Sequence, residues 1–462
     1  MRKALKLNDI SFLIGEKARA PTHVAAMATF HYPPDAGEDY LQNLVRRWRE
    51  CTRFAPPFNY RYRPWPFPSW DVLDDDEVDL DYHFRHSALP RPGGERELGV
   101  LVSRLHSHAL DRNRPLWECH VIEGLEDGRF ALYIKVHHSQ IDGVGGIRVL
   151  QSMLAETPDA PPVEPIWAVG MGRPRRDPDE PRPPKMRPKL WPALTAYTRL
   201  RGAMLRRRFR PRHDADNALP FATPRTSLNG RIGAPRRFAT QQYDQDRIRA
   251  IASASDTTTN DVFLAICAGA LRRYLTETGA MPTASMTAAV PVSVRPADET
   301  EVGNAITFVM AKMRTDIADP AERLAAIHRS TSTAKGHLNR LPKAAMDPYT
   351  AMLMGPYLIR IVLGLGAATR PMFNLAVSNV PGPKQTLYLD GATLDAIYPV
   401  SLLFNGQALN ITLVSYDGKS NLGFTGCRDS LPHMQRIAVY TGEALDELDA
   451  AVRGAEAEVG AA

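Results

Sequence analysis

The sequence predicts a mixed α/β (α+β) fold with two lobes that are joined by a crossover linker rich in proline and arginine. A chain of 462 residues is longer than one hydrophobic core usually organises, so two domains are expected. Helix-like and strand-like patterns occur in both halves, which favours two similar α/β lobes, and the absence of a short-period repeat disfavours a solenoid. Eleven of the 38 prolines fall within 158–192, where they disfavour helix and sheet. We therefore expect an N-terminal lobe at 1–157, a linker at 158–230 and a C-terminal lobe at 231–462.

Both predicted lobes contain helices and strands. In the first lobe, helical spacing of apolar residues covers 38–51 and 98–110, and strand patterns cover 117–123 and 130–137. In the second lobe, polar residues at 257–260 can cap a helix that Gly279 ends. Strand-like runs follow at 286–294, 306–313, 374–378, 409–415 and 422–426, and a last helix is expected at 432–452.

The linker carries a strong local excess of positive charge. Between 173 and 212 there are fourteen Lys or Arg and three acidic residues, whereas the net charge of the whole chain is +6. Apolar residues at helical spacing within 190–212 predict an amphipathic helix with arginines toward its other face, among them Arg206, Arg207 and Arg208. Such a helix suits an anionic membrane or lipid-droplet surface, and packing across the two lobes is an equal alternative. The segment lacks regularly interleaved aromatic residues, so we expect no nucleic-acid binding.

Composition and hydropathy exclude several classes of protein. Hydrophobic residues make up 44% of the chain and charged residues 23%, which is ordinary for globular domains. Polar residues interrupt the N-terminus before a signal-peptide core can form, so we expect no export. The apolar stretch at 351–368 contains Pro356 and Arg360 and is shorter than the roughly 20 residues of a membrane-spanning helix. We expect this stretch to fill the core, with an acyl tunnel as the alternative.

Four cysteines lie far apart, without a CxxC pair. This pattern indicates reduced thiols in a cytoplasmic protein and gives no sign of a zinc site. The sequence also lacks a GxSxG nucleophile elbow and a complete phosphate-binding loop, which removes the serine hydrolase and nucleotide hydrolase interpretations.

The most informative stretch has the form HHxxxDG and contains His137, His138, Asp142 and Gly143. It lies where an alternating apolar strand ends and a glycine-rich turn begins, a common place for catalytic groups. Adjacent strand residues point to opposite faces, so we do not expect the two histidines to share a metal ion. One imidazole acting as a base is the better hypothesis, because a hydroxyl must lose its proton before it attacks a thioester.

The other two motif residues are expected to shape the turn. Asp142 could pair with an arginine and hold the loop, and Arg295 and Arg53 are both candidates for that partner. Gly143 would let the chain turn where a side chain would clash. The alternative for the whole motif is a pair of structural histidines.

Several stretches together resemble the bacterial wax ester synthase/diacylglycerol acyltransferase family. That family is related to the wider HHxxxDG acyltransferases, which include chloramphenicol acetyltransferase and peptide-synthetase condensation domains. The resemblance covers nearly the whole chain and rests, beyond 137–143, on 7–13, 21–24, 115–118, 260–265, 291–295 and 378–383. The chain departs from the family at Thr22 and Ala25, where Met and Gly are more common, and this affects the expected shape of the acceptor pocket.

The resemblance implies two chloramphenicol-acetyltransferase-like lobes with the active site in a channel between them. It implies that His138 is the general base, that His137 supports it and that Asp142 is structural. The implied substrates are acyl-CoA, which is a substrate rather than a cofactor, and a fatty alcohol or diacylglycerol, with no acyl-enzyme. No cofactor is expected. The implied location is the cytoplasm, peripherally at the inner membrane or at lipid inclusions.

Three further residues are candidates for contacts with the substrate or the oxyanion. Asn260 either caps a helix or orients the substrate through its amide. Ser378 and Asn379 lie in a segment that resembles a sharp turn after a strand and could face the developing oxyanion. Two alternatives for the function remain: an HHxxxDG acyltransferase with a different hydroxyl acceptor, such as a polyketide or glycolipid, and a non-catalytic lipid-binding relative.

Overall fold

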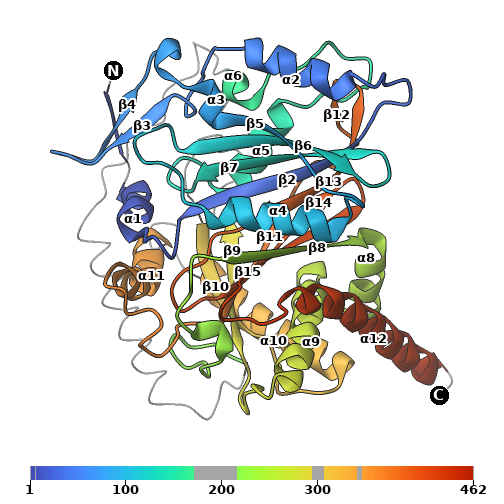
Figure 1. Cartoon of the computed structure of the whole chain (residues 1–462). Coiled ribbons are helices and arrows are strands. Elements are labelled where there is room, and N and C mark those ends of the chain that lie inside the picture. The colour runs from blue at the N-terminus through green and yellow to red at the C-terminus, as the bar shows by residue number, and fades with distance from the viewer. Residues whose placement is uncertain (1, 6, 171–215, 294–305, 341–345, 461–462) are drawn as a thin grey trace, which may run out of the picture.

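Two six-stranded sheets and one small three-stranded sheet form the framework of the protein (Figure 1). The computed structural model describes residues 2–5, 7–170, 216–293, 306–340 and 346–460. The predicted helix at 190–212, with Arg206, Arg207 and Arg208, and the candidate Arg295 lie outside the described residues. The two-lobed α/β architecture predicted from the sequence is confirmed.

The first sheet has the strand order β12-β13-β2-β7-β6-β5. The strands β2 (His23–His31), β7 (Arg129–His137) and β6 (Trp117–Leu125) form antiparallel pairs, and β5 (Phe84–Ala88) runs parallel to β6. These observations confirm the strands predicted at 117–123 and 130–137. Apolar side chains on one face of β7 pack into a buried core, whereas polar side chains occupy the end of the strand where the HHxxxDG motif begins.

The second sheet has the order β10-β9-β11-β14-β15-β8. Its first three strands along the sheet are β10 (Ile306–Lys312), β9 (Thr287–Ser293) and β11 (Leu375–Val380), and the last three are β14 (Leu409–Tyr416), β15 (Lys419–Cys427) and β8 (Arg236–Asp244). Only the pairs that β11 makes, with β9 and β14, are parallel. Each strand predicted in this half is present.

Strands from the second half of the chain complete the first sheet. β12 (Tyr388–Leu389) pairs with β13 (Ala392–Val400), and β13 pairs antiparallel with β2. This insertion of β12 and β13 into the first sheet was not predicted from the sequence. Where the two sheets meet, a side chain at Gly423 in β15 would overlap the carbonyl oxygen of Pro399 in β13. A glycine is therefore required for the sheets to approach this closely.

Helices cover the sheets and enclose separate cores. The largest core lies between the second sheet and the helices α8 (Gln245–Ala254), α9 (Thr259–Glu277), α10 (Pro320–Asn339) and α12 (Gln435–Gly460). In the first lobe, α2 (Tyr40–Glu50), α5 (Gly143–Ser152) and α6 (Ile166–Val169) contribute to one core, and α4 (Glu95–Ser107) packs on another together with residues of the first sheet and β8.

Local sequence signals explain where α9 begins and ends. The hydroxyl of Thr258 accepts a hydrogen bond from the backbone N–H of Asp261, and the Asp261 carboxylate accepts one from the backbone N–H of Thr258, which is a capping box. Gly279 follows the helix with a φ of 64°, the left-handed conformation that glycine adopts without strain. The prediction of a capped helix that Gly279 ends is confirmed.

Two expectations about proline-rich and apolar stretches were wrong in part. Within 158–192, where neither helix nor sheet was expected, α6 forms and its Trp167 is fully buried in the core of the first lobe. The apolar stretch at 351–368 overlaps α11 (Met346–Val362), which buries Leu353, Tyr357 and Ile361 as expected. Its other face is exposed, and Ile359 retains 60% of its accessible surface.

The small sheet consists of β1 (Arg2–Ala4), β4 (Ser69–Val72) and β3 (Tyr60–Arg63) in that order. It lies beside α1 (Leu7–Gly15), because Leu13 of α1 belongs to the same core as residues of β3 and β4. The short helices α3 (Leu80–His83), η1 (Asp75–Glu77) and η2 (Ser227–Asn229) complete the elements described.

Candidate active site

His137 is the last residue of β7 and is held by hydrogen bonds at both ring nitrogens. Its Nε2 lies 2.9 Å from the hydroxyl oxygen of Thr22, and its Nδ1 lies 2.6 Å from the hydroxyl oxygen of Ser139. The Thr22 hydroxyl donates its proton to the carbonyl oxygen of Phe12, so it accepts from Nε2–H. The backbone N–H of Ser139 donates to Nδ1, which agrees with the same tautomer. His137 is thus fixed in position and fully hydrogen-bonded.

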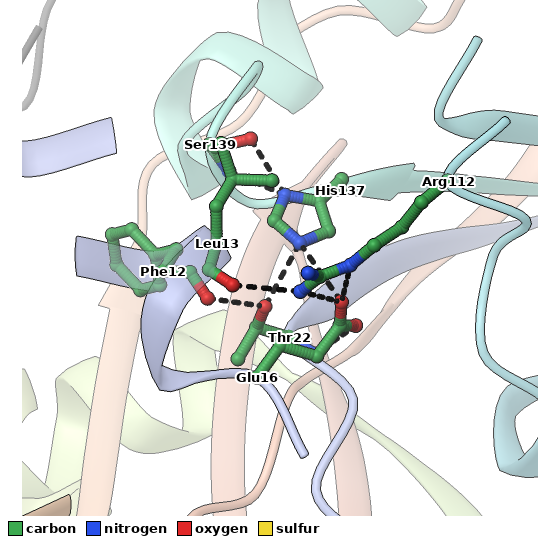
Figure 2. Close-up of polar contacts among 7 residues, drawn as sticks. All are labelled: Phe12, Leu13, Glu16, Thr22, Arg112, His137 and Ser139. Atoms are coloured by element: carbon green, nitrogen blue, oxygen red, sulfur yellow. Dashed lines mark hydrogen bonds and ion pairs between the residues drawn. The ribbon is translucent and has the colours of Figure 1, made fainter. Parts of the chain in front are cut away.

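A partly buried ion pair lies next to the Nε2 side of His137 (Figure 2). Arg112, from the loop between α4 and β6, contacts the Glu16 carboxylate and also donates to the carbonyl oxygen of Leu13 in α1. The other carboxylate oxygen of Glu16 accepts the backbone N–H of Thr22. Three segments that are distant in the sequence therefore converge on one histidine.

The Glu16 carboxylate is ionised in this setting. Burial alone would raise its pKa, but the hydrogen bond from His137 and the hydrogen bond and charge of Arg112 lower the pKa to about 2. A negative charge beside Nε2–H favours that tautomer, because it attracts the N–H proton. Glu16 and Arg112 were not predicted from the sequence, and Thr22 was considered only for the shape of the acceptor pocket. Short-range spacing carries no signal for a pair that joins α1 to the loop after α4.

His138 lies in a contrasting environment. Its ring stacks on Phe12 of α1 with 4.3 Å between the ring centroids, and its backbone N–H donates to the carbonyl oxygen of Thr22. Its buried Nδ1 has no hydrogen-bond partner among the described residues. Burial lowers the pKa of His138 to about 4, against an opposing effect of the Asp142 charge. The imidazole is therefore neutral at pH 7, and its ring is not tied into the network that holds His137.

Asp142 and Gly143 form the start of α5. The Asp142 carboxylate accepts the backbone N–H of Gly145 at 2.6 Å and so caps the helix. Arg53, a proposed partner of Asp142, instead forms an ion pair with Glu164 at 2.6 Å on the surface, so that prediction was wrong. The steric reason given for Gly143 was also wrong, because an added Cβ would lie 3.9 Å from Val380, an ordinary contact.

The same contact brings a second sequence motif close to the first. Val380 ends β11, the strand that contains Ser378 and Asn379, and it faces the start of α5. Asn379 is exposed and Ser378 is half-buried. In the following turn, a side chain at Gly382 would overlap the carbonyl oxygen of Ser415, so this segment must lie directly on β14. The structure thus brings the 378–383 segment to the HHxxxDG turn, but among the described residues neither Ser378 nor Asn379 is hydrogen-bonded to either histidine.

Asn260 lies in the first turn of α9 and is not its cap, which is Thr258. The neighbouring Asp261 is the anchor of this motif, since it is fully buried and accepts hydrogen bonds from Thr258, His328 and Thr331. Burial alone would raise the pKa of Asp261, but these hydrogen bonds lower it. The interpretation of Asn260 as a cap was therefore wrong, and its contact with a substrate stays a prediction.

The 115–118 stretch lies at the start of β6, next to the end of β7 that carries His137. The carbonyl oxygen of Leu116 accepts the backbone N–H of His137, and Trp117 is fully buried with its indole N–H bonded to the Phe58 carbonyl. Glu118 forms an ion pair with the fully buried Lys135 at 2.9 Å. Within the described part of the chain, no three His, Cys, Asp or Glu side chains gather in the manner of metal ligands.

Comparisons with known proteins agree with this geometry. Residues 5–263 match the wax ester synthase/diacylglycerol acyltransferase catalytic domain, and residues 302–449 match the C-terminal domain of the same proteins. The chain belongs to the wax ester synthase/diacylglycerol acyltransferase family. It is accordingly an acyltransferase, and the resemblance drawn from its motifs is confirmed.

Two relatives of this acyltransferase illustrate the extent of the match. A Mycobacterium tuberculosis protein assigned as a diacylglycerol O-acyltransferase is 43% identical over 481 residues, which cover 96% of each chain. The structure of the wax ester synthase/diacylglycerol acyltransferase from Marinobacter aquaeolei superposes with a TM-score of 0.80 at 36% identity, covering 97% of this chain and 99% of that one.

A more distant structure shares only the fold. The first condensation domain of the calcium-dependent antibiotic synthetase has a TM-score of 0.56 at 16% identity and covers 97% of this chain and 96% of that one. The predicted chloramphenicol-acetyltransferase-like architecture is thus confirmed at the level of fold. No helix in the described ranges is long and apolar enough to cross a bilayer.

Proposed function

We propose that this acyltransferase esterifies a long-chain fatty alcohol or diacylglycerol with the acyl group of acyl-CoA, using His138 as the general base. The observation that supports this role is the contrast between the two histidines. His137 is hydrogen-bonded at both ring nitrogens, whereas the buried Nδ1 of His138 has no hydrogen-bond partner among the described residues and burial keeps its imidazole neutral at pH 7. Only the second imidazole is therefore available to accept a substrate proton.

The reaction proceeds by direct transfer. His138 takes the hydroxyl proton of the acceptor as its oxygen attacks the thioester carbonyl carbon. The tetrahedral intermediate collapses, the carbon–sulfur bond breaks, and the imidazolium returns the proton to the CoA thiolate. Donors near the start of α5 and the 378–383 segment would stabilise the oxyanion, with Ser378, Asn379 and Asn260 as candidates. No acyl-enzyme and no resident cofactor are needed.

The test is release of free CoA from palmitoyl-CoA, first with hexadecanol and then with dioleoylglycerol, together with extraction of the ester. We expect His138→Ala to lower kcat by about 10²–10⁴ without changing thermal stability by more than a few degrees. His31→Ala is the matched control, because His31 is half-exposed at the far end of β2. Near-normal activity of His138→Ala would show that His138 is not the general base. Failure of the wild type to form either ester would point to another hydroxyl acceptor.

We also infer that the enzyme works at the inner membrane or on lipid inclusions, because its proposed acceptors partition into lipid. The arginines of the predicted amphipathic helix at 190–212 would bind anionic headgroups. Flotation with vesicles that contain phosphatidylglycerol tests this proposal. Replacement of Arg206, Arg207 and Arg208 by Glu should weaken binding, and unchanged flotation of that variant would exclude the helix as the membrane-binding element.

A further inference from the structure

Exposed apolar side chains are concentrated along one edge of the protein. In the part of the chain that the structure describes, ten large hydrophobic residues are exposed, and eight of them belong to three neighbouring segments. These eight residues, which we call the apolar edge, are Ile14, Trp65, Phe67, Leu358, Ile359, Val362, Leu363 and Leu365. Scattered exposed hydrophobics are normal, but a contiguous group of them marks an interaction site.

The three segments of the apolar edge are physically continuous. The β3–β4 hairpin carries Trp65 and Phe67, and it shares a core with Leu13 of α1. The helix α1 in turn packs on α11, where Ile361 would lie 3.8 Å from a Cβ at Gly15. Figure 1 shows the hairpin, α1 and α11 along the same side of the molecule.

The tip of the hairpin projects the two most exposed aromatic side chains. Trp65 and Phe67 retain 79% and 81% of their accessible surface. Proline at positions 64, 66 and 68 flanks both rings. Because proline lacks an N–H donor, this tip cannot pair with another strand through those residues. The aromatic side chains are therefore presented without a sheet edge that would favour aggregation.

Basic side chains surround the base of the hairpin. Arg2, Arg61 and Arg63 all form ion pairs with the single carboxylate of Asp71, which leaves an excess of positive charge. Lys17 and Arg19, directly after α1, are also exposed. The hairpin thus has aromatic rings at its tip and positively charged side chains at its other end. This arrangement matches the two layers of a phospholipid surface, because the rings suit the acyl boundary and the positive charges suit the anionic headgroups. Two copies of this edge would instead oppose like charges.

The apolar edge is close to the catalytic histidine. Phe12 of α1 stacks on His138, and Ile14, two residues later on the same helix, is 52% exposed. A lipid surface that covers α1 would therefore lie one helix away from His138. An acceptor dissolved in that surface would have a short path to the proposed base.

We propose that the apolar edge docks on an anionic phospholipid surface, with Trp65 and Phe67 inserted at the level of the headgroups. This inference rests on the proposed function in that it takes the substrate to be a membrane lipid. It involves other residues than the predicted helix at 190–212. Each contact surface can therefore be tested separately.

The first experiment is flotation of the full chain with vesicles of phosphatidylcholine and phosphatidylglycerol, without substrates. The double variant Trp65→Ser/Phe67→Ser should bind about tenfold or more weakly than the wild type. Val439→Ser is the matched control, because Val439 on α12 is 53% exposed but lies outside the apolar edge, and it should float like the wild type. Equal flotation of the double variant and the wild type would overturn the proposal.

The second experiment reads the position of Trp65 directly and does not require a disruptive variant. Among the described tryptophans only Trp65 is exposed, and Trp191 can be replaced by Phe to remove the one that lies outside the described residues. In Trp191→Phe protein, brominated lipids should quench the fluorescence and vesicles should shift it to the blue. Both signals should disappear in Trp65→Phe/Trp191→Phe. Absence of quenching in the first variant would overturn the proposal.

The remaining outcomes separate this inference from its alternatives. Flotation of His138→Ala should equal that of the wild type, so loss of catalysis leaves the docking result intact, and failure of either proposal is visible on its own. Vesicles of pure phosphatidylcholine should bind more weakly, and added salt should reduce binding. If the wild type is a dimer that Trp65→Ser/Phe67→Ser dissociates, the edge is an interface between copies and the lipid proposal is wrong.

Discussion

Arg112 donates two hydrogen bonds to one carboxylate oxygen of Glu16, from Nε at 2.9 Å and from Nη2 at 2.6 Å, although the two residues are 96 positions apart. This pair ties the loop before β6 to the end of α1. Through Thr22, whose backbone N–H binds the other oxygen of Glu16, it also fixes the partner of His137. The orientation of the first motif histidine is therefore set by residues outside the motif.

Glu16→Gln should destabilise the protein by about 2 kcal/mol, because the substitution leaves Arg112 without a charged partner in a partly buried site. Urea unfolding measures this change. Asp246→Asn is the control, since the Asp246–Arg249 pair is exposed and worth at most about 0.5 kcal/mol. Equal effects of the two substitutions would show that the Glu16 pair is an ordinary surface contact.

Thr22→Val should lower kcat for CoA release about tenfold with little change in KM, because Nε2–H of His137 loses its acceptor. Thr22→Ser keeps the hydroxyl and should restore most of the activity. If Thr22→Ser were as impaired as Thr22→Val, the methyl group and not the hydrogen bond would be the important feature. The pH dependence of kcat should be unaltered in Thr22→Ser.

Stability should fall as the pH is lowered from 6.5 to 4. Burial lowers the pKa of His106 to about 3 and those of His83 and His138 to about 4, from an ordinary value of 6.5. In this window the unfolded chain binds protons that the folded chain does not. Each of these histidines therefore lowers the free energy of unfolding by up to about 1.4 kcal/mol for each pH unit of acidification. Above pH 6.5 they no longer make the stability depend on pH. Glu16, with a pKa of about 2, extends the loss of stability from about pH 4.5 toward pH 2.

Urea unfolding at a series of pH values measures this dependence. His83→Phe should reduce the slope of the free energy of unfolding against pH by the contribution of about one proton, since Phe preserves the stack on Trp117 but cannot titrate. An unchanged slope in this variant would mean that His83 is not kept neutral in the folded state.

Gly423→Ala should destabilise the protein by about 3 kcal/mol, because the added methyl group overlaps the Pro399 carbonyl where the two sheets meet. Gly336→Ala is the matched control. It lies within α10 with no neighbour within 4 Å of a Cβ, and it should stabilise the helix by roughly 0.5–1 kcal/mol. Thermal unfolding of the two variants should therefore shift in opposite directions, and a shift in the same direction would contradict the steric argument.

The sequence predicted local elements well because their signals are local. Alternation of apolar residues located β6 and β7, and the turn that begins at His137 followed from the same pattern. The capping residues of α9 and its terminating Gly279 are also short-range signals. The motif resemblance identified the family because several such stretches occur together.

Contacts between distant segments could not be predicted in this way. The pairing of β13 with β2 depends on hydrogen bonds that any extended strand can make, and spacing along the chain does not specify them. Arg53 was a reasonable partner for Asp142 by charge, but Glu164 is its partner in the structure. The role of Gly143 was inferred from glycine's usual conformational freedom, whereas this position needs none.

Because β13 pairs with β2, the first sheet cannot be completed until most of the chain has been synthesised on the ribosome. Thr29 of β2 and Asp395 of β13 are hydrogen-bonded in the finished protein but are 366 positions apart. At about 5–20 residues per second, β2 waits on the order of 20–70 seconds for its neighbour to be translated. An unpaired strand edge can pair with another chain during that time. Nascent chains that stall between the two halves will therefore expose β2 and depend on chaperones for solubility.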